Sequence, residues 1–188
     1  MRKLVVYVLT SVDGAVDDPR RYFADNDPAV AGAPVFDAVM ERLETELIGG
    51  QDAVLLGRHM YDEWSRYWPT SNEQPFADFI NGVKKYVVTS TPLIHAWANA
   101  EAVSGPIADV VRDLKALPGG DIGVHGSITL AQSLLAEGLV DDLHLAIGPV
   151  LDPVGRRLFE HLGDPRRLDL VRATPTPGGT VWVTYRVS

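Results

Sequence analysis

The sequence predicts an α/β domain with a mixed, mostly parallel sheet that ends in a C-terminal antiparallel hairpin. Three observations predict it. Apolar runs rich in β-branched residues alternate with segments of helical spacing through most of the chain. Near the end, three apolar runs follow one another without a long helix between them. The last two are separated by Pro175–Gly179, a composition typical of a hairpin connection.

Eight segments have the apolar composition expected of strands. The first could be mistaken for an export signal, because Arg2 and Lys3 precede it. Its apolar run is too short for a signal-peptide core and far too short for a membrane helix, so we interpret it as a buried strand. The eight predicted strands are Lys3–Leu9, Ala53–Leu56, Lys85–Thr89, Ala100–Val103, Ile122–Val124, Leu143–Val150, Leu168–Ala173 and Thr180–Val187.

Three helices are predicted from helical spacing and from residues that begin or end helices. One opens at Pro34 and stops at Gly49, with apolar residues at Phe36, Val39, Met40, Leu43 and Leu47. A second is capped by Ser104 and ends at Pro118. A third runs from Ser127 to Gly138. The polar segment Asp17–Pro34 is long for a connection, and we expect it to be functional or mobile.

Composition limits the classes of function. The 188 residues suit one domain, taken here as 1–188. Hydrophobic residues make up 46% and charged residues 22%, as in globular proteins. The net charge of -8 argues against nucleic acid or an anionic membrane as the main partner. No cysteine is present, which excludes disulfides and thiolate metal sites and fits a cytoplasmic location. The five histidines have no metal-ligand spacing.

Two predicted strands run through glycine into a helix. In the first, Val54–Leu56 leads into Gly57 and Arg58. In the second, Ile122–Val124 leads through His125 and Gly126 into the helix at Ser127. Glycine lets a ligand approach the backbone, and the free N–H groups of a helix start attract phosphate. Both junctions on one sheet edge could hold the two ends of a dinucleotide, although such turns also occur purely as geometry.

Carboxylates are the remaining candidates for catalysis. Asp13 follows the first strand, where a site at the sheet edge would open, although a turn residue beside Gly14 is an equal interpretation. Asp37 and Glu41 lie four residues apart and share one face of the first predicted helix, which could equally be a solvated face. Trp64, Trp68 and Trp97 could stack on a ligand ring, but core packing is the default role for most of them.

Four motifs, in order and spacing, resemble the bacterial proteins related to dihydrofolate reductase and to the C-terminal reductase domain of the bifunctional riboflavin-biosynthesis enzyme. Thr10–Gly14 resembles the opening S-L-D-G, and Leu55–Asp62 resembles L-L-G-R-R-T-Y-E. Lys85–Thr91 resembles K-Y-V-V-S-R-T. His125–Leu130 followed by Gly138–Leu143 resembles H-G-S-x-x-L followed by G-L-V-D-E-L. The resemblance covers nearly the whole chain and implies a three-layer dihydrofolate-reductase-like fold.

The resemblance implies a cytoplasmic NADPH-dependent reductase. It would transfer hydride to a small heterocyclic or sugar-derived imine or carbonyl compound, pteridine-like or pyrimidine-like. One such substrate is that of a 5-amino-6-(5-phosphoribosylamino)uracil reductase in riboflavin biosynthesis. The two helix starts would hold the phosphates, Thr89 and Ser90 would lie near the adenosine ribose, and Val8 and Leu9 would face the nicotinamide. The implied cofactor residues are Val8, Leu9, Gly57, Arg58, His59, Met60, Thr89, Ser90, Gly126, Ser127, Ile128, Thr129 and Leu130. By position, Asp37 is the candidate acid, with Glu41 behind it.

The chain departs from the family pattern at three places. Met60 replaces a threonine, and Leu151–Gly155 replaces a glycine-rich turn. Ser90 stands where many relatives have an arginine, which weakens recognition of the 2′-phosphate and leaves NADH as an alternative cofactor. These departures leave a second function open: a non-catalytic protein that binds a nucleotide or another small molecule and retains the fold.

The C-terminal strand predicts a homodimer. It alternates valines and Tyr185 on one face with Trp182 on the other, so both faces carry apolar surface. Trp182 would be exposed unless something packs on it, and a two-fold contact is a common solution. The family resemblance also implies pairing. The alternative is a monomer in which a helix of the same chain covers Trp182.

Overall fold

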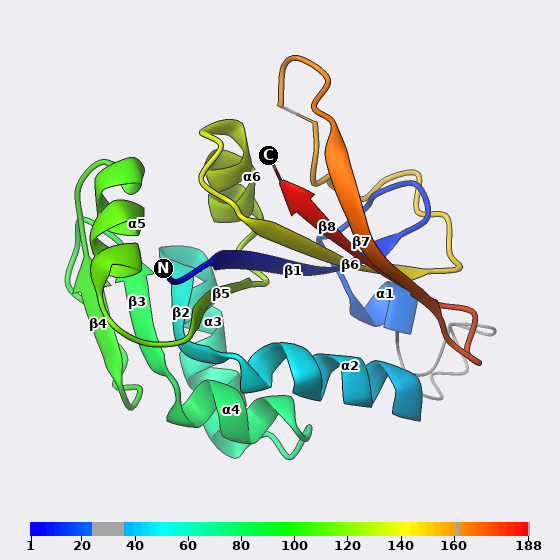
Figure 1. The fold of residues 1–188 in the computed structure, drawn as a ribbon. Helices are drawn as coiled ribbons and strands as arrows, with labels where there is room; N and C mark the ends of the chain where they lie inside the picture. The colour runs from blue at the N-terminus through cyan, green and yellow to red at the C-terminus, as the bar shows by residue number, and fades with distance from the viewer. Residues whose placement is uncertain (24–35, 161, 188) are drawn as a thin grey trace.

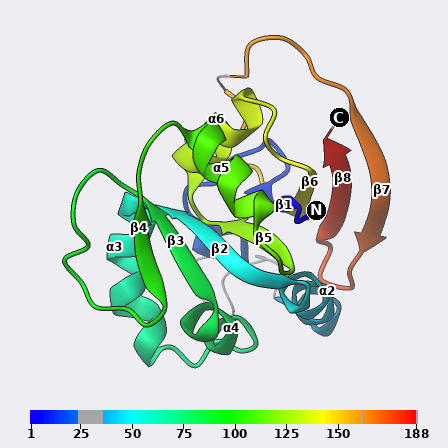
Figure 2. The same cartoon turned by 60° about the vertical axis from the view of Figure 1, so that its left-hand side comes forward.

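The structure, a computed structural model, describes residues 1–23, 36–160 and 162–187 and contains one eight-stranded sheet (Figures 1 and 2). The strand order is β4-β3-β2-β5-β1-β6-β8-β7. The first six strands in this order are parallel, and β8 and β7 continue the sheet in antiparallel pairing. The predicted mixed sheet with a C-terminal hairpin is confirmed.

The strands are β1 (Leu4–Ser11), β2 (Gln51–Gly57), β3 (Lys84–Val88), β4 (Ala100–Val103), β5 (Asp121–His125), β6 (Asp142–Gly148), β7 (Leu168–Pro175) and β8 (Val181–Val187). The helices of the described residues are α1 (Arg20–Phe23), α2 (Ala38–Gly49), α3 (Arg58–Tyr67), α4 (Phe76–Gly82), α5 (Ile107–Ala116) and α6 (Ile128–Ala136), with a short 3₁₀ turn at Trp68–Thr70. All eight predicted strands are present, with ends shifted by at most two residues.

Helices cover both faces of the sheet, which gives three layers (Figure 1). On one face α5 and α6 pack on inward-pointing strand residues such as Val6, Leu55 and Val124. On the other face α2, α3 and α4 cover the alternate residues, including Tyr7 and Leu56. The alternation follows from the period of two along each strand, which sends neighbouring side chains to opposite faces.

Two helix starts differ from the sequence-based expectation. The helix expected to be capped by Ser104 begins later, at Ile107, with Pro106 as its N-cap and no side-chain cap. Gly105 has a φ of +120°, so the turn into the helix is made by glycine and proline instead. The helix expected from Pro34 begins at Ala38 with Asp37 as its N-cap. Pro34 and most of the Asp17–Pro34 segment lie outside the described residues.

Trp182 corrects the argument that predicted a dimer. Its side chain is 2% exposed, because it stacks on Tyr7 at 4.7 Å and packs in one cluster with Leu43 of α2. A helix of the same chain therefore covers it, which is the alternative that the sequence left open. The outer edge of the sheet is β7, since β8 lies between β6 and β7.

Lys85, a residue of the K-Y-V-V motif, has a structural role. It is fully buried, and its Nζ donates to the carbonyls of Ile80 at 2.7 Å and Val83 at 2.8 Å, beneath the ring of Trp97. Burial lowers the pKa of Lys85 to about 8. The lysine thereby joins the C-terminal end of α4 to the start of β3.

Candidate functional site

The two glycine junctions meet at one edge of the sheet. Strands β2 and β5 are parallel neighbours, so the helices that follow them begin side by side. The N–H of Gly57 donates to Oγ of Ser127 at 3.0 Å, which links the two junctions directly. A Cβ added at Gly57 would lie 3.8 Å from Cβ of Leu130 and of Ser127. The sequence-based prediction that both junctions share one edge is confirmed.

Neither helix start is capped by a side chain. The N-cap of α3 is Gly57, which has no side chain, and the N-cap of α6 is Ser127, which makes no side-chain cap. The Ser127 hydroxyl is instead turned toward Gly57. The first N–H groups of a helix have no partner within the helix, and together with the helix dipole they favour phosphate.

Val8 and Leu9 lie beside this pair of helices. The last β1 residue in register with β5 is Tyr7, opposite His125, whereas β1 continues to Ser11 along β6. At Gly126, with a φ of +64°, the chain turns away into α6. The β5-facing backbone of Val8 and Leu9 is therefore unpaired by β5 and borders the turn at Gly126.

Arg58 and Thr89 are brought together at the outer end of the site. The Arg58 guanidinium contacts both carboxylate oxygens of Asp62, at 3.0 and 2.8 Å. It also donates to Oγ1 of Thr91 at 2.6 Å and contacts Oγ1 of Thr89 at 3.4 Å. Arg58 therefore connects α3 to the segment after β3. Ser90 lies on this segment and is exposed.

The residues after Arg58 differ in orientation. The His59 side chain is exposed and approaches only Glu63, at 3.8 Å. Met60 points toward Gly126, where an added Cβ would come within 3.2 Å of it and within 2.7 Å of the Trp64 ring. Trp64 therefore borders the glycine turn, whereas Trp68 and Trp97 are core residues. In α6, Thr129 is exposed and Ile128 and Leu130 are half-buried against the core.

The Asp13 carboxylate connects the turn after β1 to the segment that contains Asp152 and Arg157. It accepts from Oγ of Ser11 at 2.6 Å, from the N–H of Asp152 at 2.9 Å and from Arg157 at 2.9 Å. The hydrogen bond from Ser11 and then that from Asp152 lower the pKa of Asp13. A carboxylate held in its ionised form is unsuited to donate a proton. Asp152 belongs to the segment where the sequence departs from the family turn.

Asp37 caps helix α2. It accepts from the N–H groups of Val39 at 2.9 Å, Met40 at 3.0 Å and Gly178 at 2.9 Å. Burial alone would raise its pKa, but these hydrogen bonds outweigh burial and lower it. The geometry thus assigns Asp37 a structural function, and argues against the role of proton donor that its position suggested.

A cluster of buried polar side chains lies under the same strands, on the face covered by α2. It comprises Tyr7, Gln51, His125 and Glu44, each at most 8% exposed. His125 Nε2 is 2.8 Å from Oε1 of Gln51, and its ring lies edge-on to Tyr7 at 5.8 Å. The Tyr7 hydroxyl, Gln51 Nε2 and His125 Nδ1 have no hydrogen-bond partner among the described residues. Buried polar atoms are otherwise nearly always paired, so such a concentration is informative.

Glu44 is the titratable member of this cluster. Burial, followed by the charges of Glu41 and Glu73, raises the pKa of Glu44 to about 7. The Glu44 charge in turn adds to burial in raising the pKa of Tyr7. Burial lowers the pKa of His125 to about 3, so its ring is neutral. Glu44 is the carboxyl group of the site that is partly protonated near neutral pH.

The described residues contain neither a membrane-spanning helix nor a cluster of metal ligands. None of their helices is long and apolar enough to cross a membrane. Among the same residues, no group of three or more histidine, aspartate or glutamate side chains is placed to hold a metal ion.

The sheet order and the two linked helix starts define a dihydrofolate-reductase-like domain. A dihydrofolate reductase from Enterococcus faecalis, solved with NADP(H), superimposes with a TM-score of 0.62 at 12% identity, over 99% of this chain and 96% of that one. A putative riboflavin biosynthesis protein from Shewanella sp. PV-4 superimposes with a TM-score of 0.74 at 19% identity, over 99% of each chain.

The chain belongs to the RibD C-terminal domain family, whose model matches residues 2–182. It is also 30% identical over 146 residues to an uncharacterized Bacillus subtilis protein, YyaP, covering 75% of this chain and 77% of that protein. Family and fold predicted from the sequence motifs are thereby confirmed.

Proposed function

We propose that the protein is an NADPH-dependent reductase that transfers hydride to a small heterocyclic or sugar-derived imine or carbonyl compound. The hydrogen bond between Gly57 and Ser127 carries the proposal, because it places two uncapped helix starts side by side at the end of the central strands. Two adjacent anion sites of this kind suit the pyrophosphate of a dinucleotide.

The described residues fit this cofactor. The N-terminal N–H groups of α3, at Arg58–Met60, and of α6, at Thr129 and Leu130, would bind the phosphates, while the Gly126 turn leaves room for close approach. The Ile128 N–H already donates to the carbonyl of Gly126 at 3.1 Å. Thr89 and Ser90 would lie near the adenosine ribose. The backbone of Val8 and Leu9 would hydrogen-bond the nicotinamide carboxamide. When bound, the reduced nicotinamide supplies the hydride, and the chain supplies orientation and a proton.

Glu44 is the proposed proton donor. In its protonated form, Glu44 gives a proton to the nitrogen of the C=N group or to the oxygen of the C=O group. The carbon of that same group receives the hydride. The resulting carboxylate then takes up a proton from water. A pKa of about 7 suits this step, since general acids work best with a pKa near the working pH. The Glu44 charge acts on Tyr7, and His125 lies edge-on to Tyr7. The unpaired polar atoms of Tyr7 and His125 would bind the polar edge of the heterocycle.

The substrate class follows from the family and from these groups. A pyrimidine-like or pteridine-like ring offers adjacent donors and acceptors that match a neutral imidazole, a phenol and a carboxyl group. Membership of the RibD C-terminal domain family supports a substrate like 5-amino-6-(5-phosphoribosylamino)uracil. We further propose a cytoplasmic protein.

The test is a cofactor titration followed by a turnover assay. NADPH should quench tryptophan fluorescence saturably, because Trp64 borders the Gly126 turn. Oxidation of NADPH should then be measured with pyrimidine, pteridine and sugar-derived imine acceptors. Turnover on any of them supports the reductase. Binding without turnover on all three classes would favour the alternative, a non-catalytic nucleotide-binding protein, and lack of binding would contradict both.

Cofactor preference is expected to be modest. Arg58 contributes positive charge near the segment after β3, but Ser90 contributes none, so NADPH should bind only somewhat more tightly than NADH. Ser90→Arg should increase that preference, because Ser90 is exposed and an arginine there can reach a 2′-phosphate. Dissociation constants for both cofactors check this. Strong discrimination in the unmodified protein, unaltered by the substitution, would show that another residue recognises the phosphate.

The homodimer remains part of the proposal on different grounds. The edge strand β7 carries exposed Leu170 and Val171, at 60% and 53% of their full accessibility. An exposed apolar edge strand is prone to pair with another chain. Light scattering with size exclusion at micromolar concentration should give the dimer mass, and Leu170→Lys should shift it toward the monomer. A clean monomer for the unmodified protein would contradict the dimer at that concentration.

A further inference from the structure

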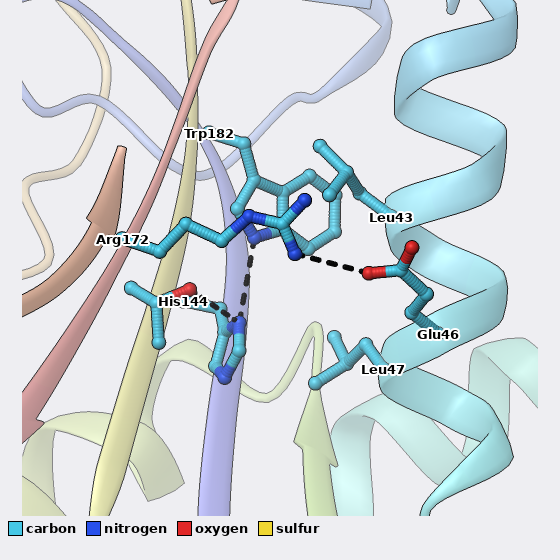
Figure 3. A pocket seen from close by; sticks show the side chains of 7 residues that line it. Leu43, Glu46, Leu47, His144, Arg172 and Trp182 are labelled. Carbon is cyan, nitrogen blue, oxygen red and sulfur yellow. Dashed lines mark hydrogen bonds and ion pairs between the residues drawn. The ribbon is translucent and has the colours of Figure 1, made fainter. Parts of the chain in front are cut away.

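A small cavity lies between α2 and the antiparallel strands, and Trp182 in its wall stacks on Tyr7 of the buried polar cluster. The cavity has a volume of about 150 Å³. Figure 3 shows its walls: side chains of α2 face those of the antiparallel strands β6, β8 and β7 across a gap. Leu43, Glu46 and Leu47 follow one stripe of the helix, and Glu44 lies on the next. The lining residues are Leu43, Glu46, Leu47, His144, Arg172, Trp182 and Thr184.

His144 is held in one tautomer. The indole N–H of Trp182, which can only donate, contacts Nδ1 of His144 at 3.4 Å, and the Thr184 hydroxyl lies 3.1 Å from the same atom (Figure 3). Nδ1 is therefore an acceptor without a proton. Burial lowers the pKa of His144 to about 4, so the ring is neutral and its hydrogen is on Nε2. His144, one of the lining residues, thus carries its single N–H at Nε2.

The opposite charges of Arg172 and Glu46, at the rim of the cavity, neutralise each other. Nη1 of Arg172 contacts Oε2 of Glu46 at 3.0 Å, and the two side chains are 47% and 51% exposed. An ion pair this exposed contributes little free energy, so it opens readily for a ligand. The pair leaves no net charge to select for an anion or a cation.

We propose that this cavity is a second binding site, for a neutral single-ring molecule with one hydrogen-bond acceptor. Leu43, Leu47 and Trp182 supply apolar walls for the ring. His144 Nε2–H supplies the donor for a hydroxyl or carbonyl oxygen on it. The size agrees, since a cavity of roughly 150 Å³ lined by apolar side chains holds benzene. The site is separate from the dinucleotide helix starts and does not depend on reductase activity.

Phenol and benzene are suitable ligands for the test, because they differ by the oxygen alone. The chemical shift of the Trp182 indole N–H, identified with Trp182→Phe, reports on the cavity wall, and that of Trp97 serves as an internal reference. Phenol should shift the Trp182 signal saturably and bind at least threefold more tightly than benzene. His144→Phe should abolish the preference for phenol.

Leu47→Trp should fill the cavity and abolish binding of both ligands, and Leu47→Phe provides a smaller filling change should the first variant fold poorly. Arg58→Ala should leave phenol binding unchanged, so failure of the cofactor proposal is distinguished from failure of this one. The proposal is overturned if phenol gives no saturable shift, if phenol and benzene bind equally, or if a folded filling variant still binds phenol.

Discussion

Glu44→Gln is expected to slow substrate reduction by roughly 10²–10⁴-fold, the usual contribution of a general acid. The amide keeps the size and the hydrogen-bonding shape of the side chain but has no acidic proton. Cofactor affinity should not change, since Glu44 lies under the sheet rather than at the helix starts. Single-turnover rates at saturating NADPH, measured with the acceptor found in the turnover assay, check this expectation.

The pH profile separates a proton donor from a structural residue. The acid form of Glu44 decreases as pH rises through about 7, so the rate of the unmodified protein should fall over the same range. The glutamine variant should show no such titration. Glu41→Gln, on the exposed side of the same helix, is the matched control. It should retain the fall in rate, moved to lower pH, because the Glu41 charge contributes to raising the pKa of Glu44. An unchanged profile in Glu44→Gln would remove Glu44 from the reaction.

Stability provides a readout without any substrate. The pKa of Glu44 is raised in the folded protein, so its contribution to stability is full below its unfolded value of 4.5 and is lost as pH rises through about 7. Glutamine cannot ionise and avoids this loss. The free energy of unfolding of Glu44→Gln, relative to the unmodified protein, should therefore increase between pH 4.5 and 7. Urea unfolding at several pH values measures it.

The sheet was predictable because each strand has a recognisable apolar sequence pattern of its own. Runs such as Val54–Leu56 are apolar on both faces, as parallel strands covered by helices must be. The two glycine junctions were also predictable, since a strand that runs through glycine into a helix has a local signature. That the two junctions would touch through Ser127 followed only from the placement of β5 beside β2.

The proposed proton donor, Glu44, could not be located from the sequence in the same way. The position of Asp37 suggests a catalytic acid. An aspartate just before a helix is also a common N-cap, and that is the role Asp37 has. Glu44 carries no local signal, because a glutamate in the middle of a helix is ordinarily exposed. Its burial depends on how α2 packs against β1 and α4, contacts between segments far apart in the chain. The one available hint was its place one residue after Leu43, next to the apolar stripe.

Arg58→Ala is the second change with a large expected effect. Losing a charge-assisted hydrogen bond to a phosphate should weaken dinucleotide binding by about 1.5–3 kcal/mol. The structure adds a second contribution, because Arg58 also holds the segment that carries Thr89 and Thr91. A fluorescence titration with NADPH measures the sum of both. Arg66→Ala, at the far end of the same helix, is the control and should bind normally.

A second substitution separates the phosphate contact from the tethering of the segment after β3. Asp62 now neutralises Arg58, with its carboxylate 2.8 Å from the guanidinium Nε. Asp62→Asn keeps a hydrogen-bond acceptor near Arg58 but removes the negative charge. If Arg58 binds phosphate, the freed positive charge should tighten NADPH binding, and more so at low ionic strength. If Arg58 serves only as a tether, Asp62→Asn should leave affinity unchanged or weaken it. Unaltered affinity in Arg58→Ala, with the fold intact by circular dichroism, would mean that the helix N–H groups hold the phosphates without this side chain.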